Sequence, residues 1–459
     1  MKAVEEVRAG KPAMRTIAVR IAPVNYLVVL LLSSFVSAFL LYIGRDTWAL
    51  GLLAVAWAVV VFMALTDRIV FDGRRIRRTG IPFRLWAYLT ATRDRIKISD
   101  VEMVQTSILR TIKRGSNLIY TYRTTIHGKG KTFTVHSNRG SYGDFIDAVL
   151  PGLKDDLLDR RSIELRDHYA ERTAVRRMAR AASIPSAEIL EDSFSGRNVQ
   201  SVTVPGGQAV PDPDRASFLH SLANQLRISG FLPQAVEAYR RAALMTPGNA
   251  VLLHDFALCL KSYAGLRRDA RVERRAKAMM RLAERRAHDD GELLSRIGES
   301  YFQFGDWRRA SAVFRKAVDR TGERFRTLIG LAEVSLHEGK IAHVIHNFTA
   351  ACSIARTPGL KRWTRQELDY FSRLNDDEEY MELEISRLNL IDTLEAVKRS
   401  TLRIALIGFP AILFGILLED RLVADIGWAV SLISLAVWAI AILGIHTLSA
   451  RIPYDQLDR

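Results

Sequence analysis

Four long apolar runs constrain this chain more than any other feature of its sequence. They cover residues 23–43, 47–66, 402–418 and 426–448. A helix rises about 1.5 Å per residue, so about 20 apolar residues cross a hydrocarbon core of roughly 30 Å. Only short polar stretches separate the runs within each pair, so each pair must turn back on itself. The sequence therefore predicts a multidomain membrane protein with two transmembrane helical hairpins, at residues 23–66 and 402–448.

Basic residues set the expected orientation of these hairpins. Residues 1–22 form a basic leader, whereas each turn between paired runs carries a single arginine. Because positive charge collects on the cytoplasmic side, we expect the leader, the middle region and the tail at 449–459 to be cytoplasmic. The formal charge of +16 fits this topology without a polyanionic partner. We expect a multi-pass protein of a bacterial inner membrane, with both termini in the cytoplasm.

Residues 67–153 have the pattern of a small sheet closed by a helix. Asp72-Gly73 lies between two short strand-like stretches and is a hairpin signal. Gly130-Lys131-Thr132 matches the end of a phosphate-binding loop, but a strand pattern follows it instead of a helix, so a hairpin turn at 128–130 is expected. We predict later strands at 96–98, 101–108, 118–126 and 131–136, and a closing amphipathic helix at 142–150.

Four short stretches stand out within this order of elements: Phe71-Asp72-Gly73, Ile81-Pro82-Phe83-Arg84, Ile98-Ser99-Asp100-Val101 and Tyr142-Gly143-Asp144-Phe145. Together with the order of elements, they resemble the bacterial pleckstrin-homology-like domains that follow paired transmembrane helices. The resemblance implies a small α+β barrel closed by a C-terminal helix, and a role in assembly instead of catalysis.

Residues 154–214 are expected to connect two domains. The first part, to about Ala182, is charged and has an imperfect apolar stripe, which predicts a connecting helix. The second part, residues 183–214, is rich in proline and glycine without a sustained period. Such a composition is typical of a flexible linker.

A period of 34 residues runs through residues 215–358. In its first copy, Ala223 and Ala235 occupy positions where two antiparallel helices pack closely, Gly230 opens the turn between them, and Tyr239 fills the space toward the next unit. The second unit is degenerate, with an insertion of basic residues around 267–275. Further matching positions are Leu222, Leu226, Ala242 and Pro247 in the first copy, and Ile297, Gly298, Tyr301, Gly305, Ala310, Phe314 and Ala317 in the third.

These residues resemble the tetratricopeptide family, which implies an all-α solenoid whose concave face binds peptides or partner proteins. The alternative is that the repeats are a rigid spacer. Residues 359–401 are expected to supply capping and connecting helices that lead back to the membrane. By their position in the repeats, the concave-face candidates are His220, Asn224, Arg227, Glu292, Ser295 and Glu299.

Two basic clusters are candidates for contact with anionic lipid head groups, although charges that encode topology on a solvated surface are the favoured interpretation. Nucleic-acid binding is disfavoured, because Asp269, Glu273 and Glu284 are interspersed among the arginines that would carry it and no aromatic platform accompanies them. Those arginines are Arg267, Arg268, Arg271, Arg274, Arg275 and Arg281. The clusters are Arg74, Arg75, Arg77 and Arg78, and Arg267 and Arg268.

The sequence contains no recognisable catalytic, cofactor-binding or metal-binding constellation. His337-Glu338 begins like a zinc-protease motif, but Ile341 stands at the closing position. We therefore expect a non-enzymatic scaffold that recruits protein partners to an envelope complex. An accessory subunit of an exporter or polysaccharide synthase is the main alternative, and a homo-oligomer remains compatible with the sequence.

Overall fold

The computed structural model describes residues 16–20, 24–80, 95–112, 118–137, 141–194 and 212–449. It divides into two compact units, residues 1–31 with 55–367 and residues 32–54 with 368–459. Several predicted features lie outside the described residues. These are most of the basic leader, the Ile81-Pro82-Phe83-Arg84 stretch, residues 195–211 of the proposed linker, and the tail from residue 450.

The first unit contains two antiparallel sheets, with strand orders β1-β2-β3-β4 and β5-β6-β7. No closed barrel forms among the described strands, so the expected barrel is not seen. Strand β1 comes from residues assigned to the basic leader, and it pairs with β2 because Val19 and Ile69 face the same core. The strands are β1 (Ile17–Arg20), β2 (Arg68–Phe71), β3 (Arg75–Thr79), β4 (Arg95–Lys97), β5 (Met103–Ile112), β6 (Leu118–Gly128) and β7 (Lys131–His136).

Both predicted hairpin turns in this region are confirmed. Asp72 Oδ1 accepts hydrogen bonds from the backbone N–H groups of Arg74 and Arg75, at 3.0 and 2.7 Å, and Gly73 has φ +83°. Lys129 and Gly130 both have positive φ, as the tight turn between β6 and β7 requires. The Gly-Lys-Thr sequence therefore lies in a strand hairpin.

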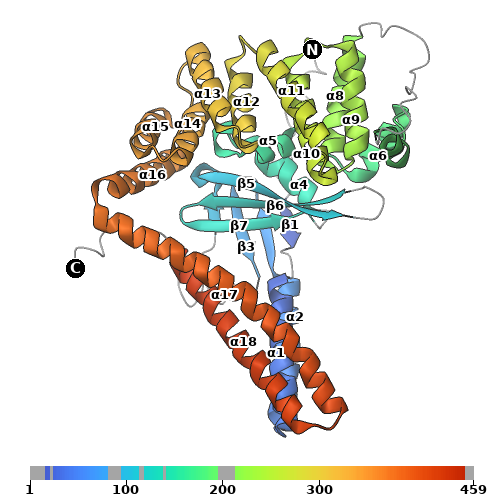
Figure 1. Ribbon diagram of the computed structural model, residues 1–459, viewed down its shortest axis with the longest axis vertical. Helices are drawn as coiled ribbons and strands as arrows, with labels where there is room; N and C mark the ends of the chain where they lie inside the picture. Colours follow the sequence, from blue (N-terminus) through green and yellow to red (C-terminus); the bar gives the residue numbers. More distant parts are fainter. Residues whose placement is uncertain are drawn as a thin grey trace, which may run out of the picture. The chain divides into compact units, whose positions relative to one another are not determined.

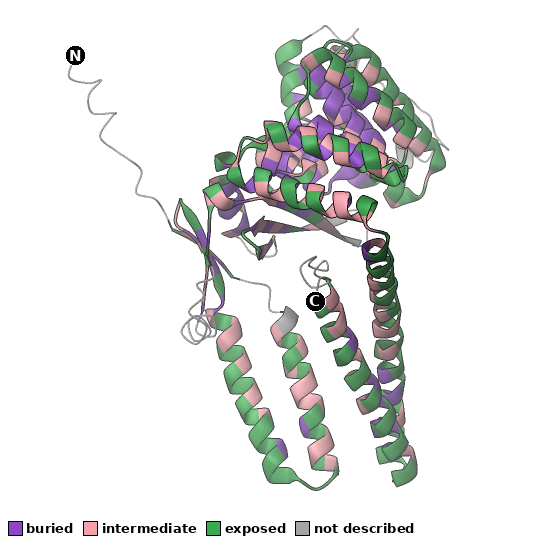
Figure 2. Ribbon diagram, turned by 90° about the vertical axis from the view of Figure 1, so that its left-hand side faces the viewer, coloured by how far each residue is buried: buried purple, intermediate pink, exposed green. Residues whose placement is uncertain are grey.

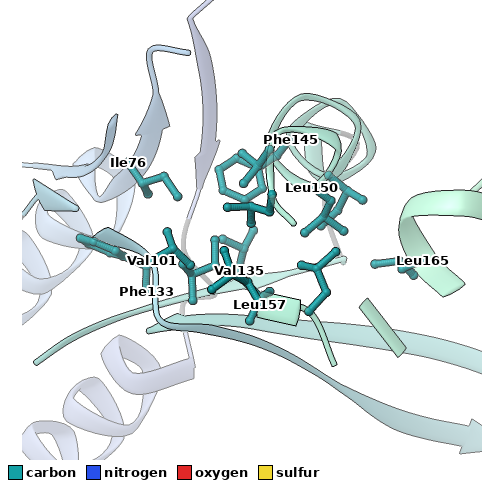
Figure 3. Close-up of a cluster of buried hydrophobic side chains, with 14 of the residues drawn as sticks. Ile76, Val101, Phe133, Val135, Phe145, Leu150, Leu157 and Leu165 are labelled. Atoms are coloured by element: carbon teal, nitrogen blue, oxygen red, sulfur yellow. The ribbon is translucent and has the colours of Figure 1, made fainter. Parts of the chain in front are cut away.

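A single buried cluster joins the sheets to the helices that follow them (Figure 3). Ile76 and Phe133 come from the two sheets, Phe145 from α4 (Ser141–Val149), and Leu165 from α5 (Arg160–His168). Phe325 of the repeat region belongs to the same cluster. Each such side chain contributes about 1.5–3 kcal/mol on burial. The sheets therefore share a core with part of the repeat region, whose other buried side chains form separate clusters.

The predicted connecting segment is more structured than its composition indicated. Its charged part forms α5 and α6 (Arg172–Ala181), and α7 (Ala187–Phe194) lies in the stretch expected to be flexible. Helix α7 is stabilised because Leu190 is buried in a cluster with residues of the first repeat. The flexible linker prediction is therefore wrong for residues 187–194.

Four helix pairs confirm the predicted repeats. Ala223, Ala235 and Ala310 are fully buried where paired helices meet, and Gly230 and Gly305 have positive φ at the turns. The basic insertion lengthens both helices of the second pair and makes no extended loop. The pairs are α8 (Pro213–Ile228) with α9 (Leu232–Met245), α10 (Ala250–Arg267) with α11 (Ala270–Arg286), α12 (Gly291–Gln303) with α13 (Trp307–Thr321), and α14 (Phe325–His337) with α15 (Ile341–Ile354).

The four apolar runs are helical, and their large apolar side chains are mostly exposed (Figure 2). Three of these helices are long and apolar enough to cross a membrane, whereas the described apolar part of the first, Tyr26–Tyr42, is shorter. They are α1 (Val24–Tyr42), α2 (Asp46–Thr66), α17 (Glu378–Leu417) and α18 (Arg421–Leu448).

The predicted capping region and third apolar run are not separate elements. After α16 (Pro358–Asp376), α17 continues for 40 residues through Pro410. The acidic stretch Asp376-Asp377-Glu378-Glu379 marks the boundary between the two helices, because the Asp377 side chain accepts a hydrogen bond from the Tyr380 backbone N–H and caps α17. Within the second unit, α17 and α18 approach closely where Gly415 faces Ala424.

Candidate partner-binding site

The first helix of each repeat, α8, α10, α12 or α14, carries the side chains from which a concave binding face would be built. All six sequence-predicted residues lie on two of these helices. The structure places another part of the chain against them: α5 lies between the β5–β7 sheet and the repeats (Figure 1) and contacts both β5 and α8. The predicted face is therefore partly filled by the protein itself.

Helix α5 begins at a cap that also fixes it to the sheet. Asp159 Oδ1 accepts a hydrogen bond from the Ser162 backbone N–H at 2.8 Å, and another from the Thr106 backbone N–H on β5 at 3.2 Å. The Asp159 backbone N–H donates to the Val104 carbonyl at 3.0 Å. These bonds occupy the edge of β5 at Val104 and Thr106 and fix the first turn of α5 beside the repeats.

Ion pairs then join α5 to the first helices of the repeats. The Glu164 carboxylate accepts hydrogen bonds from Arg227 at 2.9 Å and from Arg160 at 3.2 Å. Arg160 also donates to the Ser300 hydroxyl, and its Nη2 lies 3.4 Å from His254 Nε2. Three of the repeats are thereby connected to one turn of α5.

These pairs have strongly perturbed titration. Burial raises the pKa of the Glu164 carboxyl, but the positive charges of Arg227 and Arg160 outweigh it and hold that pKa below its usual value. For Asp255, hydrogen bonds from His220 and His254 overcome the same burial effect, and its pKa is well below the ordinary range. Both carboxylates therefore remain ionised as structural partners.

Two of the predicted residues are buried and bond within the array. Asn224 is 1% exposed; its Oδ1 accepts from the Tyr239 hydroxyl at 2.6 Å, and its Nδ2 donates to Asp255. Ser295 is 6% exposed and accepts a hydrogen bond from the Thr327 hydroxyl at 3.2 Å. In this structure neither side chain is free to contact a partner.

The other four predicted residues also have partners. Arg227 pairs with Glu164, and His220 Nε2 lies 2.8 Å from Asp255 Oδ2. Glu299 accepts two hydrogen bonds from Arg326, at 2.9 and 2.8 Å, and the exposed Glu292 pairs with Arg296 at 3.1 Å. A cavity of about 150 Å³ is lined by α5 and by four of the predicted residues: His220, Asn224, Arg227 and Glu299.

A larger open cavity, of about 320 Å³, lies where the last two repeats meet β5, α16 and the segment before α5. We call it the repeat cavity. Aromatic side chains line much of it: Phe314 and Phe325 are buried, and Trp363 of α16 contacts Phe325. The Phe314 ring has room in the wall of the cavity because Gly298 and Gly330 have no side chain, and a Cβ atom at either position would overlap the ring. Further apolar lining residues are Leu157, Leu158, Phe302, Ile329 and Leu360.

Carboxylates outnumber cations around this cavity. Arg160 and Arg326 are its basic lining residues, and both are already paired with glutamates. The acidic lining residues are Glu102, Asp156, Asp159, Glu299 and Glu333.

Glu333 is the most perturbed of these carboxyls. Its side chain contacts solvent, yet the cavity walls raise its pKa to about 7 by desolvation, and the negative charge of Glu299 adds to the shift. A cation that entered the cavity would favour the ionised form. Of the acidic lining residues, Glu102 pairs with Arg362 at 2.7 Å and Glu299 with Arg326, whereas Asp156 and Glu333 form no ion pair with described residues. The repeat cavity thus combines an aromatic lining with an acidic rim in which Asp156 and Glu333 lack a basic partner.

The residues of the repeat cavity were missed from the sequence because they come from six separate segments, at 102–105, 156–160, 299–303, 314, 325–333 and 360–363. One signal was available in the sequence: Phe325, Ile329 and Glu333 are spaced four residues apart, which places them on one face of the first helix of the last repeat. Nothing in the local sequence indicated that Asp156 or Trp363 would join them.

The lipid-surface candidates fall into different environments. Arg74, Arg75 and Arg77 are exposed, whereas Arg78 forms a two-bond pair with the buried Asp67, at 3.0 and 2.6 Å. Tyr26 also donates to Asp67, at 2.7 Å. Arg267 pairs with Glu191 at 2.7 Å, and Arg268 turns the chain between α10 and α11 with φ +54°. Arg78 and Arg267 therefore have structural partners.

Among the described residues, no group of three or more His, Cys, Asp or Glu side chains is arranged to hold a metal ion. Cys259 is buried, and burial raises the pKa of its thiol to about 12, which makes it unreactive at neutral pH.

No protein-family model and no curated protein matches the chain. Among solved structures, it is similar to TTC0263, a thermophilic TPR protein of Thermus thermophilus, with 14% identity, TM-score 0.29, and coverage of 45% of this chain and 98% of that one. It is also similar to MamA, with 13% identity, TM-score 0.26, and coverage of 31% and 79%. A third match is the APC/C hetero-tetramer Cut9-Hcn1, with 13% identity, TM-score 0.29, and coverage of 66% and 55%.

Proposed function

We propose that this chain is a membrane-anchored scaffold whose repeat cavity binds a short segment of a partner protein. The observation that carries the proposal is the cavity of about 320 Å³ with its aromatic lining and acidic rim. Charge complementarity selects the occupant: a segment in which an Arg or Lys stands beside an apolar side chain. The cation would meet the rim, and the apolar group would displace water from the aromatic rings.

Membrane anchoring is part of the same proposal. The support for anchoring is that the long helices expose many apolar side chains; Trp48 and Ile407, for example, are each 72% exposed. Soluble monomers rarely leave such continuous apolar surface in water. We include in the proposal a bacterial inner-membrane location and the recruitment of partners to an envelope complex, with the repeats in the cytoplasm.

Anchoring is tested by alkaline carbonate extraction of cell membranes, in which the chain should stay in the pellet. Reporter fusions at Asp214 and Arg45 should read cytoplasmic and external, respectively. Release into the supernatant, or the same reading at both positions, would contradict the anchoring.

Docking is tested by photocrosslinking in intact cells. A photoreactive residue replaces Gln303, an exposed residue that lines the repeat cavity, and a control replaces Gln366, which is exposed and does not line it. We expect adducts from position 303 whose crosslinked segment contains a basic and an apolar residue. The adducts should disappear when Glu333→Lys and Asp156→Lys reverse the rim charge. Adducts that survive the charge reversal would refute docking in this cavity.

A further inference from the structure

The four-stranded sheet has two chemically different faces. One face is apolar and buried, with Ile69, Phe71, Ile76 and Ile96 in the core. The strand registers place a set of exposed cations on the opposite face, and no carboxylate lies on that face within the four strands. We call this set the cationic face, and it consists of Arg20, Arg68, Arg75, Arg77, Arg95 and Lys97.

These cations stand directly opposite one another across neighbouring strands. Arg20 pairs with Arg68, Arg77 with Arg95, and Arg75 with Lys97. Like charges at directly opposed positions destabilise a sheet. The sheet therefore carries a repulsion that an external anion would relieve.

Nothing in the described part of the chain neutralises this face by a direct ion pair. The nearest carboxylates lie in turns at the sheet's ends. Asp72 accepts hydrogen bonds from the Arg74 and Arg75 backbone, and its charge acts on the arginines only through space. Asp100 forms its ion pair with Lys129, at 2.8 Å.

Chain connectivity identifies the source of the anion. Helix α2 ends at Thr66, and Arg68 is the first residue of β2. The Asp67 carboxylate between them is held by Arg78 and by Tyr26 of α1, which fixes the sheet to the ends of both apolar helices. The nearest of these cations is therefore within a Debye length, about 8–10 Å, of where the apolar helix ends.

We propose that the cationic face binds anionic lipid head groups of the leaflet from which α1 and α2 emerge. This inference rests on the proposed membrane anchoring. Each cation close to an anionic surface strengthens the attraction several-fold, and six on one face act together. Bound head groups would also remove the repulsion between the opposed pairs, so the lipid should stabilise the sheet itself.

The test uses the full chain in nanodiscs of phosphatidylcholine, or of an equal mixture of phosphatidylcholine and phosphatidylglycerol. We expect amide hydrogen exchange in β2 and β3 to slow about tenfold in the mixed discs, and high salt to remove the difference. The variant Arg75→Gln, Arg77→Gln, Arg95→Gln and Lys97→Gln keeps Arg20 and Arg68, so most of the difference in exchange between the two discs should be lost. In discs of phosphatidylcholine alone, exchange in the variant should be no faster than in the wild type, because the substitutions remove the repulsion between opposed cations.

A matched control makes the same charge change elsewhere: Arg271→Gln, Arg274→Gln, Arg275→Gln and Arg281→Gln on the exposed side of α11. This control should keep the wild-type lipid effect. Equal exchange of the wild type in both discs, or a lipid effect of undiminished size in the sheet variant, would overturn the inference. A chain retained in discs without a lipid effect contradicts this inference alone, whereas a chain that does not enter discs contradicts the proposed anchoring as well.

Discussion

At the scale of single residues, the repeat region depends on buried charges that satisfy one another. The side chains of Glu164 and Arg227 are 23% and 10% exposed, and each is the other's main ionic partner between α5 and α8. Removing one member of such a pair leaves the other charge desolvated without compensation. Glu164 and Arg227 therefore stabilise the fold, although the repeat pattern places Arg227 on a predicted binding face.

The first prediction concerns this pair. Glu164→Gln should lower the free energy of unfolding by about 3 kcal/mol at neutral pH, because Arg227 stays buried without its counter-ion. Since the folded pKa of Glu164 is depressed, its contribution is fully present above the unfolded pKa and is lost as the pH falls through the folded value. The cost of the substitution should therefore shrink in acid. Denaturant unfolding of the full chain in detergent measures it, with Glu292→Gln at an exposed pair as the control that should cost under about 1 kcal/mol.

The second prediction uses Glu333. Its folded pKa of about 7 exceeds the unfolded value, so ionising it costs stability, and this cost appears as the pH rises toward and through 7. Glu333→Gln should melt at a higher temperature than the wild type at pH 8 and at nearly the same temperature at pH 5. The difference should be small because the side chain contacts solvent. A difference in melting temperature of equal size at both pH values would show that the Glu333 carboxyl is not desolvated.

At the scale of elements, local sequence predicts most of the structure. The strands β5, β6 and β7 and the repeat helices follow from alternation, from the 34-residue period and from turn glycines such as Gly230. Strand β1 and helix α7 were not predicted, because a four-residue strand and a short helix gain their stability from burial of Val19 and Leu190 against distant partners. Secondary structure of this kind depends on tertiary packing.

The turns inside the repeats give a third prediction. Gly305 and Arg268 both have positive φ between the two helices of a repeat, but only glycine adopts that conformation without a steric cost. Arg268→Gly should therefore stabilise the protein, and Gly305→Ala should destabilise it, each by about 1 kcal/mol. Thermal unfolding of both variants measures the effects. Effects of the same sign would contradict the assignment of a shared turn geometry.

At the scale of the whole molecule, the candidate site could not be read from the sequence. The six predicted residues were assigned by analogy between repeats, which takes no account of α5. The repeat cavity requires Asp156, Glu299, Glu333 and Trp363 to come together from four segments. Such a site depends on the core that the sheets share with the repeats, and no period or motif in the sequence encodes that packing.

The measurement that tests the central claim most directly is the selection of random peptides displayed on phage against the purified full chain in detergent. The account predicts enrichment of peptides with Arg or Lys next to an aliphatic or aromatic residue. Their binding should be lost in the Glu333→Lys and Asp156→Lys variant and kept in a control with Asp319→Lys and Glu323→Lys, two exposed acidic residues that do not line the repeat cavity. Enrichment of acidic or uncharged peptides, or equal binding to both variants, would contradict it.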